Sequence, residues 1–215
     1  MWRAKNSGFT LVEVMVAAAI LAMIMGIVYG SFAGSVKTME ISEGDGEAWR
    51  KASLIIGRMA QEISCAYLPA EQGLSDITYG FMGEDRQEDG VPRDILYFIS
   101  TSLPLGGRSK GLKEVGYAIT ADPQTGEPTL LVREDSTPDD RPDEGGAKYQ
   151  LGQGIVGLDF TYFDSMGQEW PRWESSTSVF GGRLPRSVKI ALLLRDARGD
   201  IITVSTRTCI EVVEH

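Results

Sequence analysis

The first strongly patterned part of the chain is a long apolar run near its beginning. Residues 14–36 contain no charged side chain. As a helix, these roughly 23 residues would rise about 35 Å, which is enough to cross the ~30 Å hydrocarbon core of a bilayer. One acid, Glu13, stands at the start of the run. A carboxylate in an apolar membrane helix costs on the order of a few kcal/mol, so Glu13 is predicted to be functional and to need a cationic partner.

A second periodic segment follows, and it is amphipathic. Its apolar residues recur at intervals of 3, 4, 3 and 4 positions: Trp49, Ala52, Ile56, Met59 and Ile63. This spacing predicts one apolar stripe along a helix that continues beyond the membrane, with Arg58 and Glu62 outside the stripe. Between the two segments, residues 43–47 read Glu-Gly-Asp-Gly-Glu. Each glycine costs about 1 kcal/mol relative to alanine in a helix, so a kink or local melting is expected there, and the helix is expected to end within 64–68.

The remaining residues alternate short runs of β-forming residues with turn sequences. Strands are predicted at 94–100, 115–119, 129–133, 155–163, 187–195 and 200–212. Turn residues at 122–126 and 196–199 separate two pairs of these runs, which predicts two β-hairpins. Strands that follow one long helix without further helices indicate an α+β fold, in which the helix packs on a mainly antiparallel sheet.

The charge distribution restricts the function and predicts an orientation. The 215 residues carry a formal net charge of −9. Two basic residues, Arg3 and Lys5, precede the apolar run. An acidic chain is a poor binder of nucleic acid, because phosphate contacts need clustered Lys and Arg side chains. Positive charge before the apolar run favours an N-in, C-out orientation in the membrane. The bulk of the chain is therefore predicted to be extracytoplasmic.

Candidates for catalysis or metal binding are few. The one histidine is His215, the last residue, and the sequence contains no Cys/His cluster and no nucleophile motif. Two acidic stretches, 83–90 and 135–146, do not have the ligand spacing of a calcium loop, so they are interpreted as solvated loops. We therefore predict a protein that is not an enzyme and that uses neither a cofactor nor a bound metal.

The two cysteines leave two alternatives open. Cys65 and Cys209 can pair in an oxidising periplasm, which would join the end of the helix to the last strand. The other interpretation is two small buried thiols. The sequence does not decide between them.

The beginning of the chain resembles a known processing signal. The leader Met-Trp-Arg-Ala-Lys-Asn-Ser-Gly, followed by Phe-Thr-Leu-Val-Glu-Val, is very similar to a type IV prepilin signal. The resemblance implies cleavage between Gly8 and Phe9 by a prepilin peptidase, and N-methylation of Phe9. It also implies that Glu13 pairs with the N-terminal amine of a neighbouring subunit and sets the register of filament assembly. The expected parts are a leader at 1–8, a transmembrane and filament-core helix at 9–36, and a pilin-like periplasmic head at 37–215 that includes the amphipathic half of the helix.

The later part of the chain resembles the J-type minor pseudopilin of type II secretion systems. The resemblance rests on residues 50–62, 151–164, Trp170-Pro-Arg-Trp173 and 184–194. It implies a place at the pseudopilus tip, in a complex that starts pseudopilus assembly in the inner membrane and supports export of folded proteins. The implied partners are the I- and K-type minor pseudopilins, the major pseudopilin, the prepilin peptidase and the inner-membrane assembly platform. Two alternatives remain: a minor pilin of a type IV pilus or competence pseudopilus, and a membrane-anchored binding or enzymatic domain.

Overall fold

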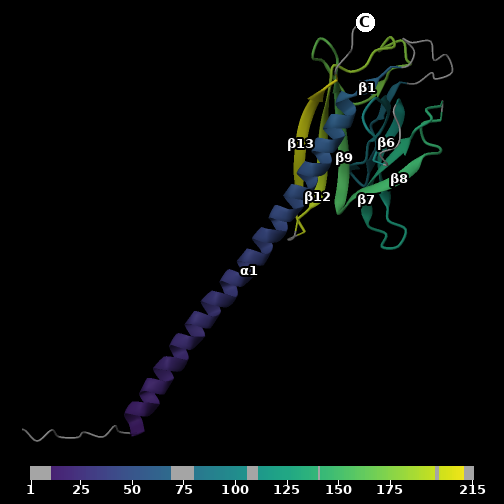
Figure 1. The fold of residues 1–215 in the computed structure, drawn as a ribbon. Helices are drawn as coiled ribbons and strands as arrows, with labels where there is room; N and C mark the ends of the chain where they lie inside the picture. Colours follow the sequence, from purple (N-terminus) through teal and green to yellow (C-terminus); the bar gives the residue numbers. More distant parts are fainter. Residues whose placement is uncertain (1–10, 69–79, 106–110, 140, 197–198, 211–215) are drawn as a thin grey trace, which may run out of the picture. The chain divides into compact units, whose positions relative to one another are not determined.

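The structure is a computed structural model, and it describes residues 11–68, 80–105, 111–139, 141–196 and 199–210 (Figure 1). The chain divides into two compact units, Met1–Asp45 and Gly46–His215. One helix, α1 (Leu11–Ser64), contributes to both units. It is helical through 43–47, so the predicted local melting is wrong. The cost of two glycines is small when many helical residues on both sides hold the helix together.

Two antiparallel sheets build the unit Gly46–His215, which is called the head from here on in place of the predicted range 37–215. The larger sheet has the strand order β11-β2-β5-β6-β7-β8, and β1 also pairs with β5. Its strands are β1 (Ala66–Tyr67), β2 (Phe81–Glu84), β5 (Ile95–Ser100), β6 (Lys113–Ala121), β7 (Pro128–Asp135), β8 (Ala147–Gln153) and β11 (Trp173–Glu174). The described elements therefore confirm the α+β prediction.

The smaller sheet has the order β10-β9-β12-β13, and a two-stranded ribbon forms a third sheet of its own. The strands of the smaller sheet are β9 (Ile155–Phe163), β10 (Glu169–Trp170), β12 (Ser187–Arg195) and β13 (Ile201–Cys209). The ribbon consists of β3 (Gln87–Glu88) and β4 (Val91–Pro92). Part of the first acidic stretch is thus strand, although most of its carboxylates remain exposed.

Both predicted hairpins are present. Strands β6 and β7 pair on either side of a turn in which Asp122 accepts hydrogen bonds from the backbone of Gln124 and Thr125. Gly126 has a φ of 71°, a conformation that glycine adopts without steric cost. At the end of the chain, β12 and β13 pair over nine consecutive residues. Strand β8 was not predicted, because only two of its side chains, Tyr149 and Leu151, pack against the core.

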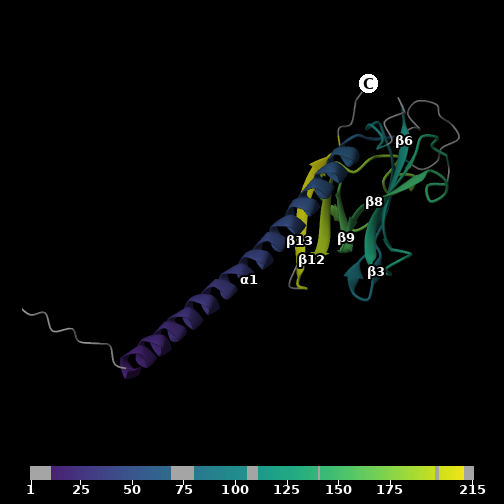
Figure 2. The same ribbon diagram turned by 60° about the horizontal axis from the view of Figure 1, so that its bottom comes forward.

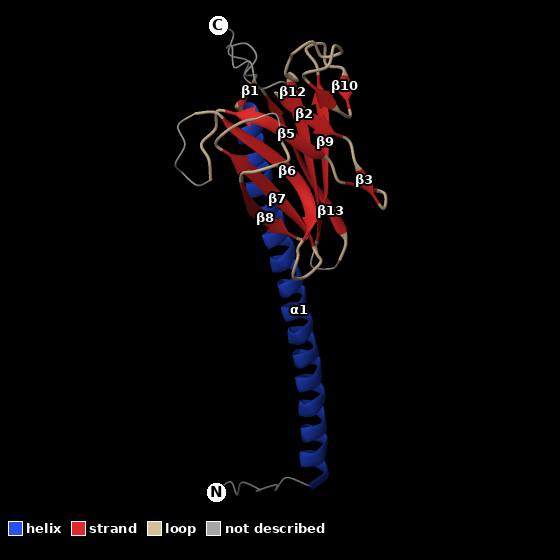
Figure 3. Cartoon of the chain, turned by 90° about the vertical axis from the view of Figure 1, so that its right-hand side faces the viewer, coloured by secondary structure: helices blue, strands red, loops and turns tan. Residues whose placement is uncertain are grey.

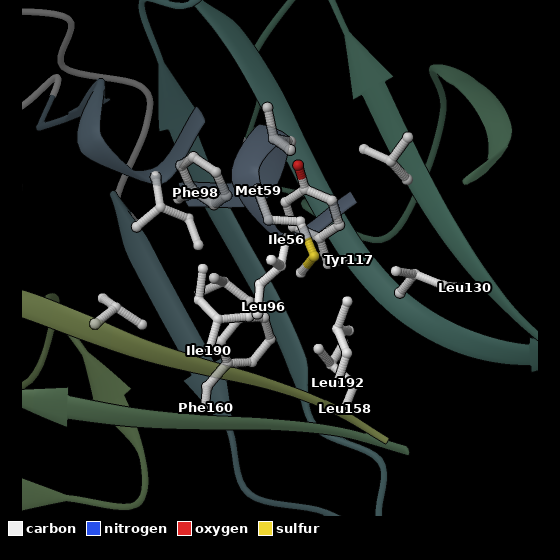
Figure 4. Close-up of a cluster of buried hydrophobic side chains, with 14 of the residues drawn as sticks. Ile56, Met59, Leu96, Phe98, Tyr117, Leu130, Leu158, Phe160, Ile190 and Leu192 are labelled. Carbon is white, nitrogen blue, oxygen red and sulfur yellow. The ribbon is translucent and has the colours of Figure 1, made fainter. Parts of the chain in front are cut away.

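The last turns of α1 supply one side of the core. Four residues of the predicted stripe are buried: Ala52, Ile56, Met59 and Ile63. Figure 4 shows Ile56 and Met59 among large side chains of both sheets, including Leu96 and Phe160. Strands of the larger sheet cross one side of this part of the helix (Figure 3). Trp49 was also predicted to be buried, but its side chain is 51% exposed.

The smaller sheet lies along the same turns of the helix. The turns before Ser64 run beside β12 and β13 in two views (Figure 1 and Figure 2). The Thr208 hydroxyl of β13 donates to the carbonyl of Ala60 (3.2 Å). Helix α1 ends at Ser64, within the predicted interval, and Ser100 and Thr101 donate to the carbonyl of Cys65 just beyond it. The helix end is therefore held by side chains of β5 and of the residue that follows it.

A buried carboxyl group joins the two sheets. Asp94 precedes β5, and its Oδ2 accepts the amide hydrogen of Phe160 in β9 (2.7 Å). Its Oδ1 accepts from the amide of Arg86 (3.0 Å), and its own amide donates to the carbonyl of Leu158. Burial raises the pKa of Asp94 from 3.8 to about 6, although both hydrogen bonds act in the opposite direction. The junction therefore contains a group that titrates in mildly acidic solution.

We predict that Gly83→Ala destabilises the head. Gly83 lies in β2, and a Cβ atom at this position would overlap the ring and hydroxyl of the buried Tyr162. Overpacking of this kind costs about 1–3 kcal/mol in free energy of unfolding. The matched control is Gly57→Ala in α1, where no other atom lies near the added methyl group, and which should stabilise the protein by about 1 kcal/mol. Denaturant unfolding of the detergent-solubilised chain measures both effects, and equal values would contradict this packing.

We also predict a pH-dependent contribution from Asp94. Because its folded-state pKa of about 6 exceeds the ordinary value of 3.8, the folded protein keeps a proton that the unfolded chain has lost between these two values. The stabilising contribution is complete below about pH 4 and is lost as the pH rises through about 6. Relative to Asp94→Asn, the free energy of unfolding of the natural chain should therefore decrease between pH 4 and pH 7. Parallel pH profiles of the two proteins would refute this assignment.

Candidate functional site

The first turn of α1 contains the predicted assembly residue. The described helix begins at Leu11, so Glu13 lies within its first turn. Gly8 and Phe9, the predicted cleavage and methylation residues, lie outside the described part of the chain.

The helix that follows Glu13 is exposed and apolar. Residues Leu11–Tyr29 have a mean hydropathy of 2.6, and none of them is buried within the chain. By length and composition this segment is able to cross a membrane. Water is a poor environment for so much apolar surface, so lipid or the helices of other proteins must cover it. This is consistent with a single-pass anchor.

A buried ion cluster in the head was not predicted from the sequence. Glu62, which the stripe pattern placed outside the apolar face, is only 3% exposed. Lys113 of β6 is 1% exposed, and its Nζ donates to Glu62 Oε1 (2.9 Å) and Glu134 Oε1 (2.6 Å). Arg58 Nη2 also donates to Glu62 Oε1 (2.6 Å). Tyr117 completes the cluster by donating its hydroxyl to Glu62 Oε2. The two carboxylates thus face two cations, as buried charges require.

The cluster also holds a loop. Lys113 Nζ donates to the carbonyl of Leu103 (3.2 Å), and Glu134 Oε2 accepts the amide hydrogen of Leu105 (2.7 Å). Burial is the main cause that raises the pKa of Tyr117 well above its ordinary value, so the phenol remains a hydrogen-bond donor. The spacing of Arg58 and Glu62 by four residues is the only part of this arrangement that the sequence signals. The contributions of β6 and β7 depend on pairing between distant strands.

A second buried ion pair lies on the opposite face of the larger sheet. Arg133 and Glu134 are neighbours in β7, so their side chains point to opposite faces. Arg133 Nη2 donates to Glu114 Oε2 (2.5 Å), and its guanidinium also donates to the carbonyls of Pro142 and Glu144. Burial raises the pKa of Glu114 to about 7 despite its hydrogen bond with Arg133. This pair attaches the second acidic stretch to the sheet, while Asp139, Asp143 and Glu144 keep exposed side chains.

The two cysteines do not form the disulfide that was one of the alternatives. Both are free thiols: Cys65 follows α1 and is partly buried, whereas Cys209 ends β13 with an exposed side chain. Cys65 lies next to β1 of the larger sheet, and Cys209 belongs to the smaller sheet. The alternative of two buried thiols is therefore wrong for Cys209. Among the described residues, no group of three or more His, Cys, Asp and Glu side chains is arranged to hold a metal ion.

Comparison with known families accounts for both parts of the chain. Residues 3–29 match the family model of the prokaryotic N-terminal methylation motif. Residues 30–201, well over half of the chain, match the model of type II secretion system protein J. No curated protein gives a significant match. The chain thus belongs to the type II secretion system protein J family, and it is a minor pseudopilin that carries the prokaryotic N-terminal methylation motif.

Proposed function

We propose that this minor pseudopilin is part of the tip complex that starts assembly of the pseudopilus in the inner membrane. Its partners there would be I- and K-type minor pseudopilins, with the major pseudopilin extending the filament below them. The proposal rests on one observation. The exposed apolar helix Leu11–Tyr29 carries a carboxylate, Glu13, in its first described turn. The apolar surface of such a helix can contact lipid before assembly and neighbouring helices afterwards.

Processing of the leader prepares the helix for assembly. We infer that the prepilin peptidase cleaves between Gly8 and Phe9 and that the new amine of Phe9 is methylated, in agreement with the family match over residues 3–29. Arg3 and Lys5 would remain on the cytoplasmic side, which leaves the head in the periplasm. The inner-membrane assembly platform would then receive the mature protein.

Glu13 would set the position of the subunit in the filament. After cleavage, Phe9 and Glu13 are four residues apart, about one helical turn. In a packed bundle, the carboxylate of one subunit can meet the amine of the next. In low dielectric the desolvation of both charges offsets much of their attraction, but an unpaired charge is costly. The pair therefore excludes wrong registers more than it increases affinity.

The role is structural, and we propose no catalytic activity. The protein J family consists of structural proteins. The buried residues Glu62, Lys113, Glu114, Arg133 and Glu134 are paired with one another across α1, β6 and β7, so they contribute to the fold. Export of folded proteins would depend on the filament that this subunit helps to start.

Glu13→Gln tests the assembly role. The amide keeps the size and removes the charge, so the neighbouring amine loses its partner. Removal of one member of a buried pair costs about 3–5 kcal/mol, and we expect secretion and filament initiation to fall at least about tenfold. The control is Glu127→Gln, which removes an exposed carboxylate from the turn between β6 and β7 and should have no effect. Normal secretion by the Glu13 variant, with normal membrane insertion, would contradict the proposal.

Gly8→Ala tests the cleavage site. A methyl group at the residue that precedes the scissile bond should block processing, so the variant should migrate in the membrane fraction like the precursor from a peptidase-deficient strain. Ser7→Ala, one residue earlier, serves as the control and should yield the mature band. A mature band from the Gly8 variant would exclude this cleavage site.

A further inference from the structure

The apolar stripe of α1 selects a face of the helix, but its apolar character alone does not select an axial position. A shift by one turn would move residues four positions earlier into the sites of Ala52, Ile56, Met59 and Ile63. These residues are Ala48, Ala52, Ile55 and Met59, which are all apolar. A shift in the opposite direction brings in Ile56, Ala60, Ile63 and Tyr67. Differences in volume would disfavour these arrangements, but neither of them buries a charge in the apolar core.

The backbone contacts at the end of the helix do not identify a residue either. The hydroxyl of Thr208 donates to the carbonyl of Ala60, and that of Ser100 donates to the carbonyl of Glu62 (3.1 Å). Every residue has a carbonyl group, so these bonds can form again after a shift. The two-residue pairing of β1 with β5 would be lost.

The ion cluster does distinguish the registers. Glu62 accepts from Lys113, Arg58 and Tyr117 in a buried position. A shift of four residues in the first direction would place Arg58 at the site of Glu62. Two cations would then face each other, with Glu134 as the one carboxylate left between them. The opposite shift would place Ala66 there and leave Lys113 without its partner on the helix.

We propose that the cluster of Arg58, Glu62, Lys113 and Glu134 sets the axial register of α1 in the head. Buried ion pairs contribute little net stability because desolvation offsets their attraction, but a mispaired buried charge is strongly unfavourable. A single polar group can specify register in this way in packed helices. A one-turn shift displaces the helix by about 5.4 Å, far beyond hydrogen-bonding distance.

A fixed register of α1 affects how force is transmitted between the helix and the head. A helix that bears load during filament assembly could slide along a core that is uniformly apolar. A cluster that rejects the neighbouring registers keeps the head attached at one position. The proposal concerns the head alone and does not depend on the role of Glu13.

Disulfide trapping measures the register directly. Ile55 Cδ1 lies 2.8 Å from the position of a Cβ atom at Gly152 in β8, so Ile55→Cys with Gly152→Cys reports the native register. Lys51→Cys with Gly152→Cys reports a shift by one turn, because residue 51 would then occupy the site of residue 55. Both pairs are built in the full-length chain with Cys65→Ser and Cys209→Ser, purified in detergent and oxidised. With the natural cluster, we expect the disulfide 55–152 and only background formation of 51–152.

Two variants of the cluster provide the test. Exchange of charges, Arg58→Glu with Glu62→Arg, places the carboxylate one turn earlier, so we expect the 51–152 disulfide to increase at least about tenfold while 55–152 decreases. The charge-neutral variant, Arg58→Met with Glu62→Gln, Lys113→Met and Glu134→Gln, removes every charge of the cluster, and it should fold and give both disulfides. Ser100→Ala is the matched control, since it removes hydrogen bonds of the helix end and leaves the charges; it should give 55–152 alone.

The opposite results overturn the proposal. If both cluster variants give 55–152 with 51–152 at background, the apolar packing determines the register. If the charge-neutral variant does not fold, the cluster holds the head together and does not select its register.

Discussion

The head depends on two conditions at one face of α1. The face must be buried, and every charge on it must have a partner. Ile56, Met59 and Ile63 join the core between the two sheets, and Glu62 enters the same interior beside them. A carboxylate there is tolerated only because Lys113 and Arg58 reach it from β6 and from the preceding helical turn. The folding of the larger sheet and the docking of the helix are therefore mutually dependent. Neither can form this interior alone.

The same helix meets a different requirement in each unit of the chain. Leu11–Tyr29 is apolar on all sides and exposed, which suits lipid or the helices of other subunits. From residue 46 onward one face is apolar and the other polar, which suits packing on a sheet in water. This change in pattern, more than any single motif, separates membrane anchoring from head formation. The family match changes at nearly the same region, from the methylation motif to protein J, and protein J favours the secretion machine over a type IV pilus.

Local patterns predicted the elements, and long-range pairing explains what they missed. Strand runs and turn residues were sufficient for the hairpins β6–β7 and β12–β13, because such contacts are close in sequence. Trp49 continues the helical spacing but is 51% exposed, so periodicity alone placed it wrongly. The burial of Glu62 and Lys113 could not be predicted, because these residues are partners only after β6 pairs in the sheet and the helix docks. The cysteines were undecided for the same reason: their separation depends on how the two sheets are placed.

Native-state hydrogen exchange of the full-length protein in detergent tests most directly whether the last turns of α1 and the two sheets form one interior. If they do, the amides of Met59 and Ile63 exchange only through global unfolding, with the same free energy as the amides of Phe98 in β5 and Ile190 in β12. If the helical amides instead exchange through a local opening of lower free energy, while both sheets stay protected, the head is stable without the helix. That result would contradict the account.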